Sequence, residues 1–496
     1  MEGSFETKIH PTGIAGLDRI LNGGLPQNRL FLIEGNPGTG KTTLGLQFLL
    51  KGVELGEKCL YITLSESEEE LTSAAASHGW SLDGIDILDL TDSLDNLKEN
   101  SRYTVFHPSE VELDQTTRAI LDVIEKTKPV RVVFDSLSEM RMMAADPLRF
   151  RRQILALKQY FMRCTCTVLM LDDRTSDAPD RQLESIAHGV ISLDYTPNDY
   201  GRQRHTIRVV KMRGLAFQSG DHDFNIVTGG LKVFPRLRTE RQTSPSEELV
   251  LKSHEANIDT LIGGLAYGTS TIVLGPAGVG KSTLALMYVM AAAERGERSA
   301  MYIFDEGPQT LFFRAASLGL DLKKYVDDGL VTVRQIQIAE LTPGEFAHMV
   351  GDEVEHNNAK LVVIDSVNGY LMATPQGKFL TMQFHELLDY LNRNGIISIM
   401  IVGQYGLVGT MQSPIDMSYL ADTVVLMRYF EAGGAIHQAV SVLKKRAGKH
   451  ERTIREYQIA PGGISVGEPL KDFRGVLTGV PVYSGDTQDL MTKKSE

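Results

Sequence analysis

The strongest constraint on the fold of this chain is an internal repeat. The segment TGIAGLDRILNGGLPQNRLFLIEGNPGTGKTTLGLQFLLKG returns about 240 residues later as EANIDTLIGGLAYGTSTIVLGPAGVGKSTLALMYVMAA. Two further pairs follow in the same order: LYITLSESEEEL matches AMYIFDEGPQTL, and RVVFDSLSEM matches LVVIDSVNGY. A chain that repeats in this way is built from two copies of one unit, so each half is expected to form a complete domain.

Within each half, short apolar runs alternate with segments of helical periodicity. This alternation predicts βαβ units and therefore an α/β fold, in which a mostly parallel sheet has helices on both faces. The length of 496 residues suits two domains of this kind. The polar segment SPSEEL marks the boundary. We expect an N-terminal domain in 1–240, a C-terminal domain in 241–470 and an extended tail in 471–496, where the periodicity ends.

Charge and apolar patterning narrow the class of protein. The net charge is −12, whereas a protein that grips nucleic acid through its phosphates normally carries a basic patch or domain. No stretch approaches the ~20 consecutive apolar residues of a membrane helix. The N-terminal sequence MEGSFETKIHPTG is acidic and polar, unlike a secretory signal. We therefore expect a cytoplasmic protein that does not contact a membrane, and the acidic balance disfavours, without excluding, a nucleic-acid partner.

Each half carries the glycine-rich motif G-x-x-x-x-G-K-[ST], as GNPGTGKT at 35–42 and as GPAGVGKS at 275–282. In such a loop the glycines let backbone N–H groups turn toward phosphate oxygens at a helix N-terminus. The lysine reaches the β- and γ-phosphates, and the Ser or Thr hydroxyl faces Mg²⁺. A glycine turn without a ligand is the alternative. Against it, both motifs follow an apolar strand, precede a helix pattern and occupy equivalent places in the repeat.

The two motifs predict two tandem RecA-like P-loop NTPase domains that bind ATP and Mg²⁺. The residues expected to bind nucleotide in these loops are Gly35, Gly38, Gly40, Lys41, Thr42 and Thr43 in the first half, and Gly275, Gly278, Gly280, Lys281, Ser282 and Thr283 in the second.

An aspartate ends a second apolar strand in each half. Asp135 closes RVVFD and Asp365 closes LVVID. A carboxylate at such a strand end can hold the water shell of a nucleotide-bound Mg²⁺. A helix cap is the alternative role, which the P-loop in the same domain disfavours. The predicted metal-site residues are Thr42, Asp135, Ser282 and Asp365.

Hydrolysis of ATP also needs a group that polarises the attacking water. The second half offers Asp305 and Glu306, at the end of MYIFDE, whereas the first half has Ser65 followed by Glu66. The next acids, Glu68 to Glu70, fit a solvated helix face. We therefore predict Glu66, Asp305 and Glu306 as catalytic residues, with one acid fewer in the first half.

With these residues in view, the chain resembles the KaiC family of double-domain RecA-like ATPases over both halves, from Lys8 to Tyr483. Beyond the P-loops, the likeness rests on a lead-in G-x-D-x-x-x-x-GG-L and on the strand that ends in a carboxylate pair. It also rests on SHGW at 77–80, KMRG at 211–214 and the tail sequence FRGVLTGVP. In that family the first half carries paired glutamates, so Ser65 is a departure from the pattern.

The resemblance implies a homohexameric ring in which each ATP lies between neighbouring subunits. The K-x-R-G segment of one subunit then reaches the nucleotide of the next, where its cations face developing phosphate charge. Matching residues are Lys211 and Arg213 in the first half and Lys444 and Arg446 in the second, where Lys445 and Ala447 depart from the usual pattern. A solvated basic strand end is the alternative.

The resemblance also implies Ser/Thr autokinase activity in the C-terminal ring. In the matching stretch DMSYLADTVVL, Ser418 aligns with the serine acceptor, Tyr419 stands where threonine is expected, and Ala421 replaces a later threonine. At most one Ser/Thr acceptor, Ser418, is therefore expected.

Three functions follow from these features. The leading hypothesis is a slow ring-forming ATPase with autokinase activity and a regulatory or timing role, which binds itself and KaiB-like or other signalling proteins. A DNA-directed RecA-like motor is the second, which the acidic balance disfavours. The third is a nucleotide-sensing scaffold with little hydrolysis, which the Ser65 departure favours for the first half.

Overall fold

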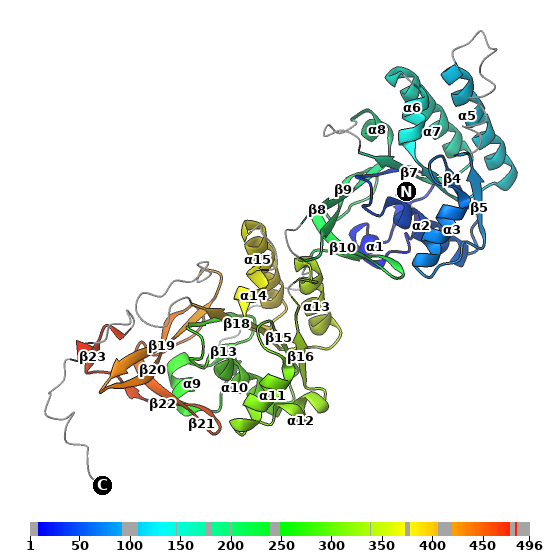
Figure 1. The fold of residues 1–496 in the computed structure, drawn as a ribbon. Helices are drawn as coiled ribbons and strands as arrows, with labels where there is room; N and C mark the ends of the chain where they lie inside the picture. The colour runs from blue at the N-terminus through cyan, green and yellow to red at the C-terminus, as the bar shows by residue number, and fades with distance from the viewer. Residues whose placement is uncertain are drawn as a thin grey trace, which may run out of the picture. The chain divides into compact units, whose positions relative to one another are not determined.

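The computed structural model describes residues 8–91, 108–144, 146–174, 181–197, 201–238, 249–337, 339–372, 377–404, 419–476 and 482–483. These residues fall into two compact units, one within 1–199 and 203–236 and the other within 200–202 and 237–496 (Figure 1). Each unit is an α/β domain around its own nine-stranded sheet.

The sheet of the first domain has the strand order β11-β10-β9-β8-β3-β7-β6-β4-β5. The strands from β8 to β5 in this order run parallel, and β9 to β11 continue the sheet antiparallel. These strands are β3 (Leu30–Gly35), β4 (Cys59–Thr63), β5 (Ile85–Asp89), β6 (Arg131–Asp135), β7 (Thr167–Asp173), β8 (Gly189–Thr196), β9 (Arg204–Met212), β10 (Asp221–Val227) and β11 (Gly230–Phe234).

The second domain repeats this topology with the order β16-β15-β17-β18-β14-β19-β20-β21-β22. Its strands are β14 (Ser270–Gly275), β15 (Ser299–Ile303), β16 (Val331–Gln335), β17 (Leu361–Asp365), β18 (Ile397–Gly403), β19 (Thr423–Ala432), β20 (Ala435–Lys445), β21 (Ile454–Ala460) and β22 (Gly463–Pro469). Both domains therefore have the mostly parallel sheet that the alternating pattern predicts.

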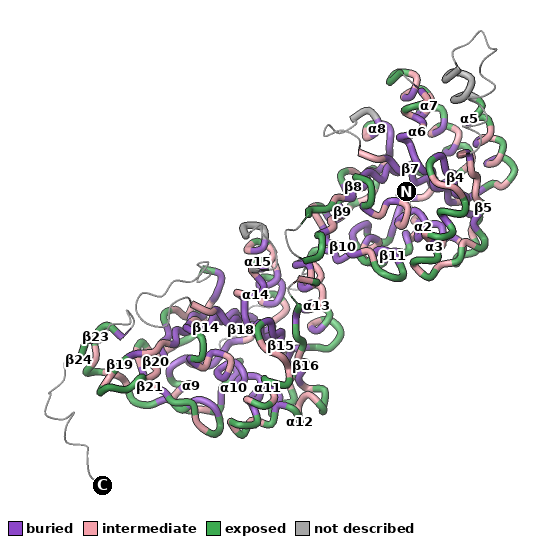
Figure 2. Tube along the Cα trace, viewed as in Figure 1, coloured by how far each residue is buried: buried purple, intermediate pink, exposed green. Residues whose placement is uncertain are grey.

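Helices cover both faces of each sheet, and much of the chain within the sheets is buried (Figure 2). A separate apolar cluster lies on each face. Parallel strands are buried on both faces, which explains why β3, LFLIEG, is almost continuously apolar. In the first domain the helices are α1 (Ala15–Ile20), α2 (Lys41–Glu54), α3 (Glu68–Ser77), α5 (Pro108–Thr127), α6 (Leu137–Ala144), α7 (Pro147–Arg163) and α8 (Arg181–Ile186). In the second they are α9 (Ala256–Ile262), α10 (Lys281–Glu294), α11 (Pro308–Ser317), α12 (Leu322–Asp327), α13 (Pro343–Glu355), α14 (Val367–Met372) and α15 (Gly377–Arg393).

The lead-in segment before each P-loop strand is fixed by its aspartate. Asp18 accepts hydrogen bonds from the backbone N–H and the hydroxyl of Thr12, both at 2.7 Å. In the second domain, Asp259 accepts from the backbone N–H and the hydroxyl of Ser253 at 2.7 and 3.0 Å. Short antiparallel pairs accompany these segments, β1 (Ile9–His10) with β2 (Leu25–Pro26) and β12 (Val250–Leu251) with β13 (Leu265–Ala266). The same local contacts therefore fix the lead-in segment in both domains.

The start of the C-terminal tail packs on the second domain. Two short strands, β23 (Phe473–Arg474) and β24 (Val482–Tyr483), pair antiparallel. The Phe473 ring lies edge-on to Phe430 of β19 with a centroid distance of 5.6 Å, and Val476 is buried beside them. Among the described residues, no helix is both long enough and apolar enough to span a membrane.

Candidate active site

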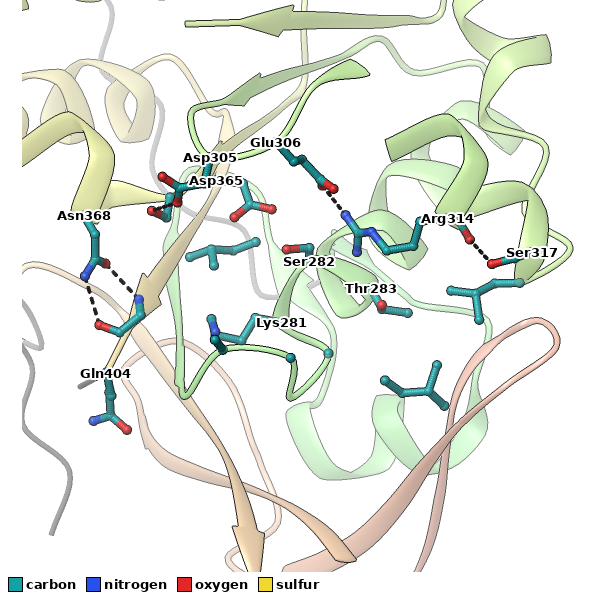
Figure 3. A pocket seen from close by; sticks show the side chains of 18 residues that line it. Lys281, Ser282, Thr283, Asp305, Glu306, Arg314, Ser317, Asp365, Asn368 and Gln404 are labelled. Carbon is teal, nitrogen blue, oxygen red and sulfur yellow. Dashed lines mark hydrogen bonds and ion pairs between the residues drawn. The ribbon is translucent and has the colours of Figure 1, made fainter. Parts of the chain in front are cut away.

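The P-loop of the second domain joins the end of β14 to the start of α10 (Figure 3). Gly278 and Gly280 have left-handed backbones with φ of 76° and 98°, a conformation that glycine adopts readily. Helix α10 begins at Lys281, directly after Gly280, and Ser282 and Thr283 follow in its first turn. The loop therefore leads into the free N–H groups of a helix N-terminus, the arrangement that binds phosphate.

A cavity of about 620 Å³ opens beside this loop, a volume typical of small-molecule sites. It is lined by Lys281 and Ser282 of α10 together with Asp305, Glu306 and Asp365 (Figure 3). The sheet order explains this convergence. Strand β17 lies between β15 and β18, and β18 pairs with β14, so the carboxyl ends of these parallel strands share one edge. Gly278, Gly280 and Thr283 also line the cavity.

The acids of this cavity have different partners. The Ser366 hydroxyl donates to Asp305 Oδ2 at 2.6 Å, and Glu306 forms an ion pair with Arg314 of α11. Burial raises the pKa of Asp365, and a hydrogen bond from Ser282 offsets part of the rise. Burial also lowers the pKa of Lys281, against the attraction of Asp365 and Asp305. The site therefore combines a buried carboxylate beside a serine hydroxyl, a buried lysine and two further acids.

The first domain builds its P-loop in the same way. Gly35 ends β3, Gly38 and Gly40 have φ of 79° and 91°, and α2 begins with Lys41, Thr42 and Thr43. The Lys41 ammonium is buried and donates to the backbone carbonyls of Gly35 and Asn36 at 3.1 and 3.0 Å. It also forms an ion pair with Asp173 Oδ1 at 2.6 Å.

Asp135, at the end of β6, is the matching carboxylate of the first domain. Its Oδ2 accepts hydrogen bonds from the Thr42 hydroxyl at 3.1 Å and from the Tyr61 hydroxyl at 2.6 Å. Burial raises the pKa of Asp135, and these two hydrogen bonds act in the opposite direction. Thr42 and Asp135 are therefore side by side, as Ser282 and Asp365 are in the second domain.

Glu66 lies in the loop between β4 and α3, beside exposed Ser65. Its backbone N–H donates to the Thr63 hydroxyl at 3.1 Å, which donates in turn to its carbonyl at 2.6 Å. Burial raises the pKa of the Glu66 carboxyl, and the negative charges of Asp135, Glu70 and Asp173 raise it further. Glu68, Glu69 and Glu70 lie on an exposed face of α3, as predicted.

The four predicted basic residues do not reach the P-loop of their own domain. Lys211 and Lys444 pair with Val190 and Val424, near the starts of β8 and β19, whereas the P-loops follow the ends of the neighbouring strands. Lys211 donates to the carbonyls of Glu184 and Ala187 at 2.6 and 2.8 Å.

The other three basic residues also bond to backbone in their own chain. Arg213 donates to the Ser185 carbonyl at 3.1 Å, Lys444 to the Ala421 carbonyl at 2.7 Å, and Arg446 to the Tyr419 carbonyl at 3.2 Å. These cations lie at the sheet edge opposite the nucleotide loops. The predicted acceptor Ser418 lies outside the described residues, and the Tyr419 side chain that follows it is exposed.

The donor sets fit Mg-ATP. Mg²⁺ is usually held through one or two carboxylates, with substrate phosphates and water supplying the remaining oxygens. Each domain offers one hydroxyl and one carboxylate together, Thr42 with Asp135 and Ser282 with Asp365, beside a glycine loop at a helix N-terminus. Such residues would hold a magnesium ion, which would neutralise negative charge on the bound phosphates.

The sequence did not predict several side chains at these sites, among them Tyr61, Asp173 and Arg314. Asp173 ends β7, which lies between the P-loop strand β3 and the Asp135 strand β6. Differences between the two halves of the repeat indicated all three of these residues. Tyr61 aligns with Met301, and Arg314 aligns with Ala74. The run TVLMLDD ends in Asp173, whereas the matching run ISIMIVG ends in a glycine.

Comparison with known proteins extends over both domains. A family model described as "ATPase: KaiC" matches residues 10–238 and 252–471. The circadian clock oscillator protein KaiC of Thermosynechococcus vestitus is 26% identical over 487 residues, which covers 97% of this chain and 93% of that protein. The circadian clock protein KaiC2 of a Synechocystis strain is 28% identical over 476 residues, which covers 95% of this chain and 83% of KaiC2. The circadian clock protein KaiC3 of the same strain is 25% identical over 485 residues, which covers 96% of this chain and 95% of KaiC3.

Two nine-stranded, mostly parallel sheets with a P-loop before the first long helix of each domain define a tandem RecA-like P-loop ATPase. The match of the family model over most of the chain makes the assignment specific. This chain belongs to the KaiC family of ATPases.

Proposed function

We propose that this protein hydrolyses ATP in its second domain with Asp305 or Glu306 as the water-activating group. The observation that carries the proposal is the single cavity that Lys281, Ser282, Asp305, Glu306 and Asp365 share. Lys281 would lie against the β- and γ-phosphates. Ser282 and Asp365 would hold the magnesium ion, which supplies charge neutralisation at the transferred phosphoryl group. A carboxylate within hydrogen-bond reach of water would take its proton as the water attacks.

ATP hydrolysis by the full chain tests this assignment. The double change Asp305→Asn with Glu306→Gln keeps the shape of both side chains and removes both bases, so second-domain turnover should fall by about 10²-fold or more. Measured in a Lys41→Ala background, which silences the first domain, second-domain turnover that survives the double change would overturn the role of these acids. Hydrolysis that DNA stimulates would instead favour a nucleic-acid motor.

We also propose a homohexamer in which Lys211, Arg213, Lys444 and Arg446 act at the nucleotide of a neighbouring subunit. In its own chain each cation lies at the sheet edge opposite the P-loop, so a role at a nucleotide requires a second copy. Light scattering with and without Mg-ATP tests this proposal. Hexamers should form with Mg-ATP and weaken in Arg213→Ala, whereas a monomer in both conditions would contradict it.

Autokinase activity at Ser418 is a further part of the proposal. It is supported by the resemblance of DMSYLADTVVL to the acceptor segment of the family, in which only Ser418 keeps a Ser/Thr hydroxyl at the paired acceptor positions. Intact-mass measurement after incubation with Mg-ATP should show at most one added phosphate in this segment, which Ser418→Ala removes. A phosphate mapped to Tyr419 would refute the assignment.

The biological role that we propose is regulatory or timing-related, in the cytoplasm. Its support is that the relatives are named as circadian clock proteins and that the net charge is −12, which disfavours a nucleic-acid partner. A KaiB-like or other signalling protein is the proposed partner class. Retention of a KaiB-like protein by the full chain in a pull-down is the expected result, and its absence would count against this partner class.

A further inference from the structure

Two groups of the first nucleotide site are already bonded to side chains of the protein itself. The ammonium of Lys41 pairs with Asp173 Oδ1 at 2.6 Å, and Asp135 Oδ2 accepts from the Tyr61 hydroxyl at 2.6 Å. Lys41 and Asp135 are the residues that would meet the phosphates and the metal shell. Both are buried, with 8% and 6% of their surfaces exposed, and Tyr61 is buried as well, so the Asp135–Tyr61 contact is poorly screened by water. The Asp173 side chain is 31% exposed, so water screens the Lys41–Asp173 ion pair from the aspartate side only.

The second site lacks both partners. Strand β18 ends in Gly403, opposite Gly275, where β7 ends in Asp173 opposite Gly35. Strand β15 carries Met301 opposite Val363, where β4 carries Tyr61 opposite Val133. A glycine offers no carboxylate, and a methionine offers no hydroxyl donor.

The Lys281 ammonium consequently has fewer bonding partners within the protein than the Lys41 ammonium. Its ammonium donates to the Pro276 carbonyl at 2.6 Å. Within the described part of the chain, no carboxylate lies at ion-pair distance from it. Asp365 and Asp305 act on it only as more distant charges.

These contacts compete with a bound nucleotide. To reach the phosphates, Lys41 has to leave the Asp173 carboxylate, which then faces the phosphate oxygens with a like charge. The Tyr61 and Thr42 hydroxyls both donate to Asp135 Oδ2. The Tyr61 hydrogen bond therefore reduces the negative charge that this oxygen can offer to the metal's water shell. At the second site no aspartate has to release the lysine and no tyrosine donates to the metal-site carboxylate, because Gly403 and Met301 stand in those places.

We propose that Asp173 and Tyr61 make the first site the weaker of the two for Mg-nucleotide, so that the second site fills first as the nucleotide concentration rises. Occupancy of the first domain then reports high nucleotide and magnesium levels. This inference concerns binding and does not depend on which acids catalyse hydrolysis.

Photolabelling of the full chain with 8-azido-ATP, followed by peptide mapping, measures both sites in one molecule. In the unaltered protein, second-domain peptides should reach half-labelling at about a tenfold lower probe concentration than first-domain peptides. Asp173→Asn keeps the side-chain shape and removes the charge, so it should lower the first-site midpoint by about tenfold and leave the second-site midpoint unchanged. The second site is thus an internal control for folding.

Tyr61→Phe should lower the magnesium concentration needed for half-labelling of the first site by about threefold, because a single hydrogen bond is removed. Tyr302→Phe is the matched control. Its hydroxyl donates to the Met349 carbonyl at 3.3 Å, away from the metal-site residues, and the change should leave both labelling midpoints as they are.

A reciprocal variant, Gly403→Asp, places the acid in the second site and so tests the same effect without altering the first domain. A Cβ at Gly403 would meet its nearest neighbour, the Asn368 side chain, at 3.5 Å, an ordinary contact. Gly403→Asp should therefore weaken the second site by about tenfold. Equal midpoints in the unaltered protein would overturn the proposal. So would an Asp173→Asn chain whose first-site midpoint is unchanged while its hydrolysis falls, because Asp173 would then orient water instead of restraining Lys41.

Discussion

Arg314 of α11 forms an ion pair with Glu306, whereas the equivalent residue of α3 in the first domain, Ala74, offers no cation to Glu66. The two domains therefore hold their matching glutamates in different electrostatic surroundings. In the second domain a guanidinium balances the acid, and in the first the nearby charges of Asp135, Glu70 and Asp173 are all negative. Several measurable differences between the domains follow from this contrast.

Removing Arg314 should disable the second domain more than the first. Arg314→Ala frees Glu306 from a fixed position at the cavity wall, and we expect second-domain hydrolysis to fall about tenfold, as for the loss of a positioning contact. Single-turnover hydrolysis in a Lys41→Ala background measures this domain alone. Arg314→Lys keeps the charge and should recover part of the rate, whereas an unchanged rate in Arg314→Ala would show that the ion pair is not needed.

On acidification, first-domain hydrolysis should be lost at a higher pH than it would be if Glu66 had an ordinary pKa. Burial and three neighbouring acids raise the pKa of Glu66, so its carboxylate, the form that can accept a proton from water, is lost at a higher pH as the solution is acidified. The pH–rate profile of the Lys281→Ala chain should therefore have its acid limb above the usual range of a glutamate. Glu66→Gln should abolish that limb together with the rate, and a profile that is flat on the acid side would contradict the role of Glu66.

The two P-loop lysines should separate assembly from turnover. Because the first domain has Ser65 where the second has Asp305, we expect Lys41→Ala to weaken ring assembly more than it lowers hydrolysis, and Lys281→Ala to remove most phosphoryl transfer. Light scattering and phosphate release on the same samples provide the two readouts. If Lys41→Ala abolishes most hydrolysis while hexamers persist, the division of labour is reversed.

The sequence predicted the fold class correctly because the fold rests on local patterns. Apolar runs such as RVVFD and LVVID became β6 and β17, and each G-x-x-x-x-G-K-[ST] motif became a loop that ends at a helix start. The convergence of Asp135 with Thr42 was also predictable, since parallel strands end at one edge of a sheet.

Contacts that depend on the order of strands could not be predicted in the same way. Asp173 meets Lys41 only because β7 lies between β3 and β6, and Tyr61 reaches Asp135 from the neighbouring strand β4. Sequence patterns identify strands but leave their neighbours open, so these partners of the nucleotide-binding residues became visible only in the folded chain.

A buried arginine should contribute to the stability of the first domain and has no counterpart at the equivalent position of the second. Arg131 opens β6 and is fully buried, with its Nε 2.5 Å from Glu57 Oε2 and its Nη1 donating to the carbonyls of Pro11 and Phe48 at 2.7 and 2.9 Å. It therefore links β6 to α2 and to the lead-in segment. The second domain has Leu361 at this place in the sheet.

Arg131→Leu should destabilise the first domain by about 3–5 kcal/mol, because it leaves Glu57 and two carbonyls without their partner. Arg295→Leu is the matched control. Arg295 pairs with Glu297, the counterpart of Glu57, at 3.4 Å on the surface, with 39% of its side chain exposed, so its loss should cost less than about 1 kcal/mol. Calorimetry on the full chain should show the first-domain transition moving down by about 10 °C in Arg131→Leu and hardly moving in Arg295→Leu. A shift of equal size in the two variants would mean that the buried arginine contributes no more to stability than the surface one.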